Sequence, residues 1–290
     1  MIGRRGSRCQ GCEPGAIVKP GVQANMTIMR LLMAFSVLLS LVVPAFGGAL
    51  AEGRPGRLTY AAYVAGLRVF ELEVALDVAR DRYRVDLAYR TAGVLGAVVS
   101  GGLRSVSQGR FVAGQVAPSH LSVDGEWRGK PRRTEIDYID AIPVVRVLEP
   151  PSEEEREVVP AALQRGTVDS VGSVLALLRQ LEDGRGCDGA RRVFDGRRLS
   201  EIAATGAGQE VLEPTGRSSF SGPTTRCDFQ GRLLAGFMLA DDRARAARPQ
   251  SGSAWMARVL PNAPPLPVRM VFDARWLGHV TMYLTSVTPG

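Results

Sequence analysis

Residues 70–90 read FELEVALDVARDRYRVDLAYR and alternate apolar with charged side chains. In the first half the apolar positions share one parity: Phe70, Leu72, Val74, Leu76 and Val78. The second half repeats the pattern at Tyr83, Val85, Leu87 and Tyr89. A period of two is typical of antiparallel strands that have one face on a core and one in water. This stretch therefore predicts a β-hairpin with Asp81 in its turn.

Similar runs lie on both sides of this hairpin. Glycine and proline residues bound them, and these residues mark turns between strands. We expect further strands at Leu58–Ala65, Leu103–Val112, His120–Arg128 and Thr134–Ile139. Near the carboxyl end, alternation returns at Val268–Trp276 and Val280–Leu284.

Between these regions the strand pattern is shorter. Asp195-Gly196 predicts a hairpin turn between strands at Arg191–Phe194 and Arg198–Thr205. Two more strands are expected at Arg226–Phe229 and Leu233–Leu239, with a turn at Asp228–Gly231 between them.

Two segments are expected to be loops. Residues 143–160 hold an acidic run between prolines, which is typical of a solvated loop, with an acidic partner site as the alternative. Residues 241–252 are polar and rich in arginine, which predicts a mobile loop.

One helix is expected, at about residues 169–182. An apolar stripe with helical spacing runs along it through Val171, Val174, Leu175, Leu178 and Leu181. Thr167 or Asp169 can cap its start, and Gly184 or Gly186 can end it. The predicted fold class is therefore mainly β, a curved antiparallel sheet or open β-barrel or roll with one packed α-helix.

The amino-terminal region has the features of a secretory signal peptide at residues 26–51. Leu31–Val43 is an apolar run of 13 residues, shorter than the roughly 20 that a membrane-spanning helix needs. Ala49-Leu50-Ala51 supplies the small-residue cleavage pattern. We expect residues 1–25, with Cys9 and Cys12, to be untranslated or removed, and residues 52–290 to form one periplasmic β domain without a transmembrane segment.

The charge and the cysteine content of the expected mature domain bear on what it binds and on its compartment. Residues 1–51 hold five of the 36 bases and one of the 29 acids, so residues 52–290 carry 31 bases and 28 acids, a net charge of +3. Such a balance does not indicate nucleic-acid binding. Cys187 and Cys227 predict one disulfide in an oxidising compartment, in preference to a metal half-site or a reactive thiol.

No pattern in the sequence indicates catalysis, a metal or a cofactor. His120 and His279 have no serine-elbow context, and we expect both to be structural or surface residues. The acids Glu71/Glu73 and Glu135/Asp137 share strand faces as glycosidase carboxylates do, but the alternation predicts a solvated face.

Two features suggest binding. Arg191-Arg192 and Arg197-Arg198 make a basic hairpin that either binds an anionic headgroup or phosphate-bearing glycan or serves solubility and edge protection. Gly93–Leu103, GVLGAVVSGGL, is an uncharged apolar link between strands. It is either buried under the sheet or lies at the mouth of an apolar cavity, in which case Val94, Leu95, Val98 and Val99 contact the ligand.

The order of several short motifs resembles a family of exported bacterial proteins known as domain of unknown function 3108. The motifs are Tyr60–Gly66, Thr91-Ala92-Gly93, Gly114-x-x-x-Pro118, Thr167–Asp169, Cys187 with Phe194–Arg198, and Cys227 with Ala235-Gly236-Phe237. The resemblance implies a curved antiparallel β fold and no activity. A looser architectural likeness is to the open β-barrels of envelope lipoprotein carriers.

These observations favour a non-catalytic periplasmic protein that serves the cell envelope and holds an apolar or lipid-like ligand in the concave face of its sheet. The alternative is a structural or interaction protein that binds an envelope protein through a sheet edge or the basic hairpin. A hydrolase with an unrecognised site is third. A cavity lined by apolar side chains would favour the carrier, and a packed interior would favour the interaction protein.

The signal peptide makes a direct prediction. Cleavage after Ala51 should give an unlipidated protein that begins at Glu52 and fractionates with the periplasm. Amino-terminal sequencing of the purified protein tests this, and a retained Met26 or recovery in the membrane fraction would contradict it.

Overall fold

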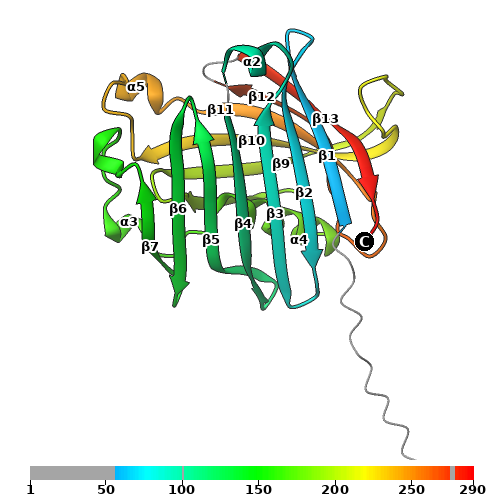
Figure 1. Ribbon diagram of the computed structural model, residues 1–290. Coiled ribbons are helices and arrows are strands. Elements are labelled where there is room, and N and C mark those ends of the chain that lie inside the picture. Colours follow the sequence, from blue (N-terminus) through cyan, green and yellow to red (C-terminus); the bar gives the residue numbers. More distant parts are fainter. Residues whose placement is uncertain (1–55, 100, 275–277) are drawn as a thin grey trace, which may run out of the picture. The chain divides into compact units, whose positions relative to one another are not determined.

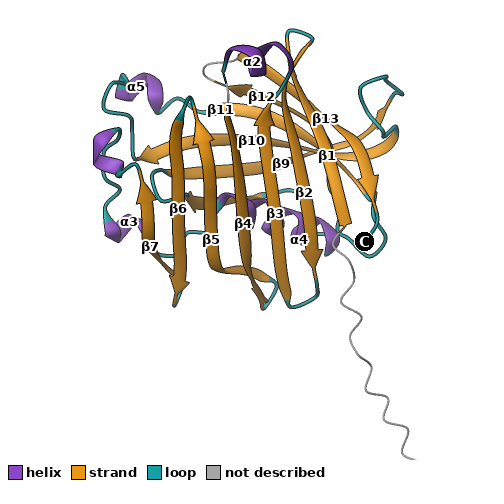
Figure 2. Cartoon of the chain, in the orientation of Figure 1, coloured by secondary structure: helices purple, strands orange, loops and turns teal. Residues whose placement is uncertain are grey.

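The computed structural model describes residues 56–99, 101–274 and 278–290, and thirteen strands within them form one antiparallel sheet (Figure 2). Residues 1–25, the predicted signal peptide and Trp276 lie outside the described residues. The sheet order is β7-β6-β5-β4-β3-β2-β1-β13-β12-β11-β10-β9-β8. Strands next to each other in sequence therefore pair, except that β7 and β8 form the two edges and β1 pairs with β13. The mainly β class, with a curved and unclosed antiparallel sheet, is confirmed.

The sheet consists of two meanders joined at β1 and β13. The first meander comprises β1 (Gly56–Val64), β2 (Leu67–Val78), β3 (Arg82–Thr91), β4 (Gly101–Val112), β5 (Gln115–Trp127), β6 (Lys130–Ile139) and β7 (Ile142–Glu149). The second comprises β8 (Gly189–Phe194), β9 (Leu199–Leu212), β10 (Gly222–Ala235), β11 (Gln250–Ala257), β12 (Leu266–Ala274) and β13 (Gly278–Thr288). In Figure 1 the second meander lies behind the first, with its strands running nearly crosswise.

Short helices occupy the connections, and one longer helix lies at the interior. The helices are α2 (Gly93–Val98), the 3-10 helix η1 (Ser152–Glu154), α3 (Ala161–Gln164), α4 (Ser170–Glu182) and α5 (Arg243–Ala246). The predicted helix is α4, and Asp169 is its N-cap, as expected.

The N-cap of α4 also ties the helix to the sheet. Asp169 is fully buried, and its carboxylate accepts one hydrogen bond from the Gly172 amide (2.8 Å) and another from the Ser107 hydroxyl of β4 (3.1 Å). Leu175 and Leu178 then pack into the main core. Val171 and Leu181 of the predicted stripe also pack on this core, but Val174 is 48% exposed, so its place in the stripe was predicted wrongly.

Side chains fill the interior in two clusters. The main cluster surrounds α4 and includes Leu58, Tyr60, Val268 and Leu284, none of them more than 3% exposed. The second joins Leu121 and Ile136 of the first meander to Phe194 and Leu199 of the β8–β9 hairpin. The hairpin turn reaches the opposite layer, because a Cβ on Gly196 would lie 2.9 Å from the Thr134 side chain.

The disulfide between Cys187 and Cys227 is confirmed. It joins the segment before β8 to the middle of β10, and both cysteines are at most 1% exposed. The bond therefore holds the end of the α4 region against the second meander.

The structure corrects three loop or turn predictions in the second meander. Residues 228–231 form no turn, because β10 continues through them and pairs with β9 and β11 on both sides. The expected second strand at 233–239 ends at Ala235, and Gly236 follows with a positive φ of 79°. Residues 241–252 are not a mobile loop, since α5 and the start of β11 occupy them.

Two further corrections concern the first meander. Residues 143–160 were expected to be a loop, but residues 142–149 form β7. Pro143 is compatible with this strand because β7 is an edge of the sheet, where the missing amide breaks no inner ladder. Gly93–Leu103 is not a loop either, because α2 and the first residues of β4 share it.

The buried cap of α4 predicts a large and specific loss of stability. Asp169→Ala removes an N-cap, which costs about 0.5–2 kcal/mol, and leaves the buried Ser107 hydroxyl without its partner, which costs about 1–3 kcal/mol. We expect a loss of about 2 kcal/mol or more in urea unfolding. Asp242→Ala is the matched control, because Asp242 caps the short helix α5 at the surface, and it should lose at most about 1 kcal/mol. Equal losses would contradict this role.

The same residue predicts a pH effect. Burial raises the pKa of Asp169, although hydrogen bonds from Gly172 and Ser107 oppose the rise. The folded state then binds the proton more strongly than the unfolded chain, so Asp169 lowers stability as pH rises above about 3.9. Asp169→Asn keeps a capping oxygen and does not ionise. Its unfolding free energy should decline less with pH than that of the wild type, and parallel profiles would refute the effect.

The disulfide predicts that Cys187→Ala lowers the unfolding free energy by about 2–5 kcal/mol. Labelling of free thiols in denatured, unreduced protein should modify neither Cys187 nor Cys227. Labelling of both would exclude the bond in the purified protein.

Candidate ligand-binding surface

The outer face of the second meander carries a row of alternating arginine and aromatic side chains. Arg226, Trp255, Arg269 and Tyr283 are in register across β10, β11, β12 and β13, so they project from the same side of the sheet. The Arg226 and Arg269 guanidinium groups lie 5.3 and 4.6 Å from the Trp255 ring centre. Tyr283 continues the row, 5.8 Å from Arg269.

The row extends onto β1 and the β9–β10 connection. The Tyr63 ring meets Tyr283 edge to face at 5.9 Å, and Arg217 stacks over Tyr63 at 4.7 Å. We call these six residues the arginine–aromatic row: Arg217, Tyr63, Tyr283, Arg269, Trp255 and Arg226. Stacked cations of this kind favour a fixed arrangement of long side chains.

Backbone contacts hold the β9–β10 connection over this face. The Ser219 amide donates to the Leu284 carbonyl (2.8 Å), and Arg217 donates to the Gly66 carbonyl (3.3 Å). Trp255, with Arg226 and Arg269 over its ring, is only 6% exposed although it lies on the outer side of β11. The row therefore forms a wall beside the more open part of the sheet.

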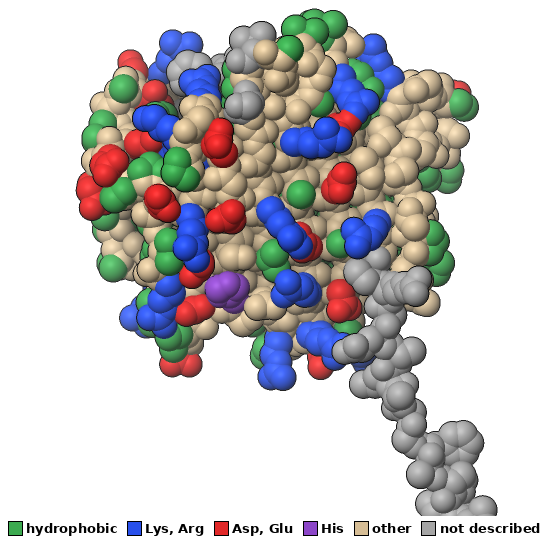
Figure 3. Space-filling view, viewed as in Figure 1, with side chains coloured by type: hydrophobic (Ala, Val, Ile, Leu, Met, Phe, Trp, Pro, Cys, Tyr) green, Lys and Arg blue, Asp and Glu red, His purple; other side chains and the backbone are tan. Residues whose placement is uncertain are grey.

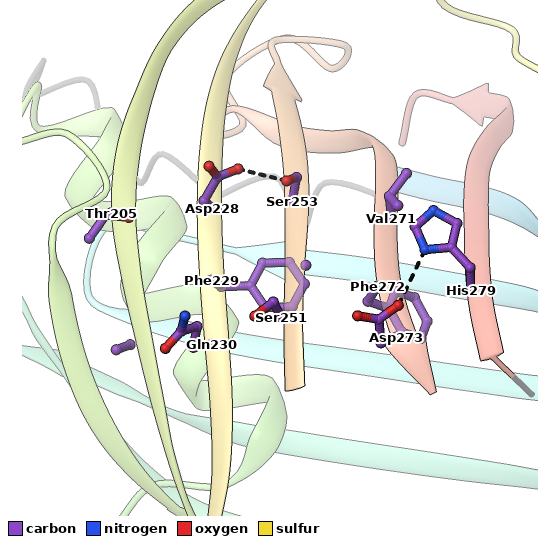
Figure 4. Close-up of a pocket in the computed structure, with 12 residues that line it drawn as sticks. Thr205, Asp228, Phe229, Gln230, Ser251, Ser253, Val271, Phe272, Asp273 and His279 are labelled. Carbon is purple, nitrogen blue, oxygen red and sulfur yellow. Dashed lines mark hydrogen bonds and ion pairs between the residues drawn. The ribbon is translucent and has the colours of Figure 1, made fainter. Parts of the chain in front are cut away.

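A groove of about 620 Å³ lies next to this wall (Figure 4). Small residues form much of its lining: Ala203, Ser251, Gly252 and Ser253. The hydrogen-bonding groups around it are Thr205, Asp228, Gln230, Asp273 and His279, which come from β9, β10, β12 and β13. The groove exists because short side chains occupy adjacent strands.

Each acid of the groove has a partner. Asp228 accepts from the Ser253 hydroxyl (2.6 Å) and from Arg226 (2.9 Å), and these contacts, the Ser253 bond first, hold its pKa below the usual range. Asp273 lies 3.3 Å from Nδ1 of His279. Ser253 thus donates to Asp228 and not to His279, and Figure 4 shows the two pairs apart. They form no nucleophile–base pair.

The four residues that were predicted to contact a ligand differ in their exposure to solvent. Val94 of α2 is 62% exposed, whereas Leu95 packs against the main core. Val99 is half-buried, and the side chain of Val98 lies outside the described set. Leu95 therefore attaches α2 to the sheet. Ligand binding by the four residues stays a prediction.

The four arginines of the basic hairpin make hydrogen bonds or ion pairs with other residues of the chain. Arg197 donates to the Pro150 carbonyl (2.6 Å), Arg191 to Gln180, and Arg192 to the Leu163 carbonyl. Arg198 pairs with Asp195 at 2.6 Å. Burial acts to raise the pKa of Asp195, but Arg198 and the turn amides hold it below its usual range. These contacts favour a structural role for the hairpin over anion binding.

Glu135 and Asp137 lie in ion pairs on the solvated face of the first meander, where Figure 3 shows intermixed charges. Glu135 pairs with Arg133, and Asp137 contacts both His120 (2.9 Å) and Arg146 (2.8 Å). The hydrogen bond from His120, followed by that from Arg146, keeps the pKa of Asp137 low.

Glu71 was predicted to share a solvated face with Glu73, but only Glu73 is exposed. Glu71 is 9% exposed because it lies against Arg68 and Arg90. Within the described ranges, no group of three or more His, Cys, Asp or Glu is placed to hold a metal ion.

The sequence reasoning missed the groove and its wall because it took the start of β11 for a loop. Ser251, Ser253 and Trp255 share one parity, with Ala254 and Met256 on the other. This alternation could have identified the strand. The register that aligns Trp255 with Arg226 and Arg269 has no comparable local signal.

Comparisons with known proteins confirm the family. The family model described as "Protein of unknown function (DUF3108)" matches residues 59–285, so the chain belongs to this family. Among solved structures, one similar chain is the crystal structure of a beta-barrel-like protein of domain of unknown function DUF1849 from Brucella abortus. It is 13% identical, with a TM-score of 0.51, over 82% of this chain and 98% of that one. The likeness supports the fold. No curated protein matches significantly.

Proposed function

We propose that this member of the DUF3108 family is an exported, non-catalytic binding protein of the cell envelope, and that its outer-face groove binds a neutral, hydroxyl-rich ligand such as an oligosaccharide. The observation that carries the proposal is the lining of the groove. Hydrogen-bonding side chains surround a floor of small residues, and both acids already have partners.

The donors and acceptors of the groove match hydroxyl groups. Gln230 offers both an amide oxygen and an amide NH₂ group, while Asp228 and Asp273 retain acceptor capacity beyond their present partners. Sugar hydroxyls donate and accept, so one ligand can satisfy all of these groups. Val271 adds apolar surface on which the C–H face of a sugar ring can pack. An anionic ligand is disfavoured because it would face two carboxylates.

The interior of the sheet supports binding at an outer surface rather than carriage inside. Core side chains, α4 and the β8–β9 hairpin occupy the concave side. This packing favours the interaction class over a carrier of an apolar or lipid-like ligand. An envelope protein that presents hydroxyl-rich chemistry fits the same surface.

Two observations support export to the periplasm. The chain forms a buried disulfide, which is typical of oxidising compartments. In the part of the chain that the structure describes, no helix has the length and apolar character needed to cross a bilayer. Together with the sequence features of residues 26–51, these observations fit an envelope location outside the cytoplasm.

The proposal predicts that the purified protein binds at least one of maltotriose, cellotriose and chitotriose in saturation-transfer NMR and calorimetry. Replacing Gln230 and Asp273 together by alanine removes two hydrogen-bonding groups, each worth about 0.5–1.5 kcal/mol, and should weaken binding about tenfold or more. Asp124→Ala is the control, because Asp124 is an exposed acid on the outer face of the first meander.

Two results would contradict the proposal. One is that none of the three sugars binds. The other is binding of a fluorescent fatty-acid probe that Val94→Asp abolishes and the groove variant leaves unchanged, which would instead support a carrier with its entrance at α2.

A further inference from the structure

We infer that the end of the sheet that carries α2 docks on an anionic lipid surface. This surface borders the wall of the groove at Arg217, but the inference does not depend on what the groove binds. We call it the α2 end, and it comprises the β1–β2 turn with Leu67 and Arg68, helix α2, and the β5–β6 turn with Arg128 and Lys130.

Two exposed apolar side chains lie together at the α2 end. Leu67 is 55% exposed and Val94 is 62% exposed. Their backbones are adjacent, because the Ala92 amide donates to the Val69 carbonyl at 2.8 Å and the start of α2 packs on Arg68. In Figure 3 hydrophobic side chains appear at the end of the molecule where Figure 1 places α2.

Helix α2 is attached to the sheet by one apolar side chain and leaves another exposed to solvent. Leu95 packs on the main core, while Val94, one position earlier, projects outward. Residues 93–103 carry no charge, so this segment can approach a hydrocarbon boundary without burying an ion.

Cations surround the apolar pair in excess of acids. Arg68 and Arg90 have side chains 48% and 66% exposed and share a single carboxylate, that of Glu71. Arg217 stacks on Tyr63 and donates to the Gly66 carbonyl of the β1–β2 turn, so its positive charge also lies at this end.

The β5–β6 turn adds two more cations beside α2. Arg128 and Lys130 are exposed, with Glu126 as the nearby acid in sequence. Trp127 fixes this turn next to the start of β4, because a Cβ on Gly101 would lie 2.6 Å from its ring, and the ring stacks on Phe70. Apolar tips framed by Lys and Arg are the pattern that binds anionic membranes.

Vesicle co-sedimentation of the mature protein tests the inference. Vesicles of equal parts phosphatidylglycerol and phosphatidylcholine should retain the wild type, and vesicles of phosphatidylcholine alone should retain much less. Val94→Asp should weaken the association with the mixed vesicles about tenfold, because it places a negative charge at the apolar tip. Replacing Arg128 and Lys130 by glutamine should weaken it and reduce its dependence on salt.

Val112→Asp is the matched control. Val112 is 59% exposed and ends β4, at the opposite end of the strands from α2, so this variant should bind as the wild type does. Circular dichroism should show all variants folded, since each changed side chain is exposed. Failure of the wild type to bind the mixed vesicles, or equal loss in Val94→Asp and Val112→Asp, would overturn the inference. Neither result alters the sugar-binding test of the groove.

Discussion

The carboxylate of Asp169 is the contact on which the interior arrangement depends. A curved sheet with two layers leaves a concave space that must be filled, since protein interiors are packed without large voids. Helix α4 fills much of it, and Asp169 both starts the helix and joins it to Ser107 in β4. A charged group at full burial is costly, but here its hydrogen bonds give the helix one position in the sheet.

The β8–β9 hairpin is the second element that fills the interior, and hydrogen bonds to an aspartate hold it as well. The β8–β9 turn places Phe194 and Leu199 in the core, and Asp195 holds the turn by accepting hydrogen bonds from the Arg197 and Arg198 amides. The disulfide at Cys187 then fixes the chain just before this hairpin. With the concave side occupied in this way, the surfaces left for recognition are the outer face of the second meander and the ends of the strands.

The elements that were predicted correctly were identified from the local spacing of apolar side chains. Alternation identified the β2–β3 hairpin, and the spacing of Leu175 and Leu178 identified α4 with its Asp169 cap. Strand β10 was divided at residues 228–231 because their side chains suit a turn, but pairing with β9 and β11 overrides that preference. The edge strand β7 was missed for a similar reason, since its proline suggested a loop.

The candidate groove was beyond prediction for a different physical reason. Its wall and floor depend on register across six strands, β1 and β9 to β13, and bulges such as those at Thr59/Tyr60 and Trp255/Met256 shift that register. A shift of one residue exchanges the two faces of a strand, so no local pattern specifies which residues share a surface. Tyr63 and Tyr283 lie near opposite ends of the domain's sequence, yet they become neighbours because β1 pairs with β13.

The same pairing connects the two surfaces of the molecule. Arg217 stacks on Tyr63 in the wall of the groove, and it donates to Gly66 in the turn that precedes Leu67. A lipid surface that met the α2 end would therefore lie at one end of the arginine–aromatic row, with the groove along its side. Because the row is held by ring stacking and backbone contacts, the orientation of the groove relative to such a surface would follow from the fold and not from a flexible linker.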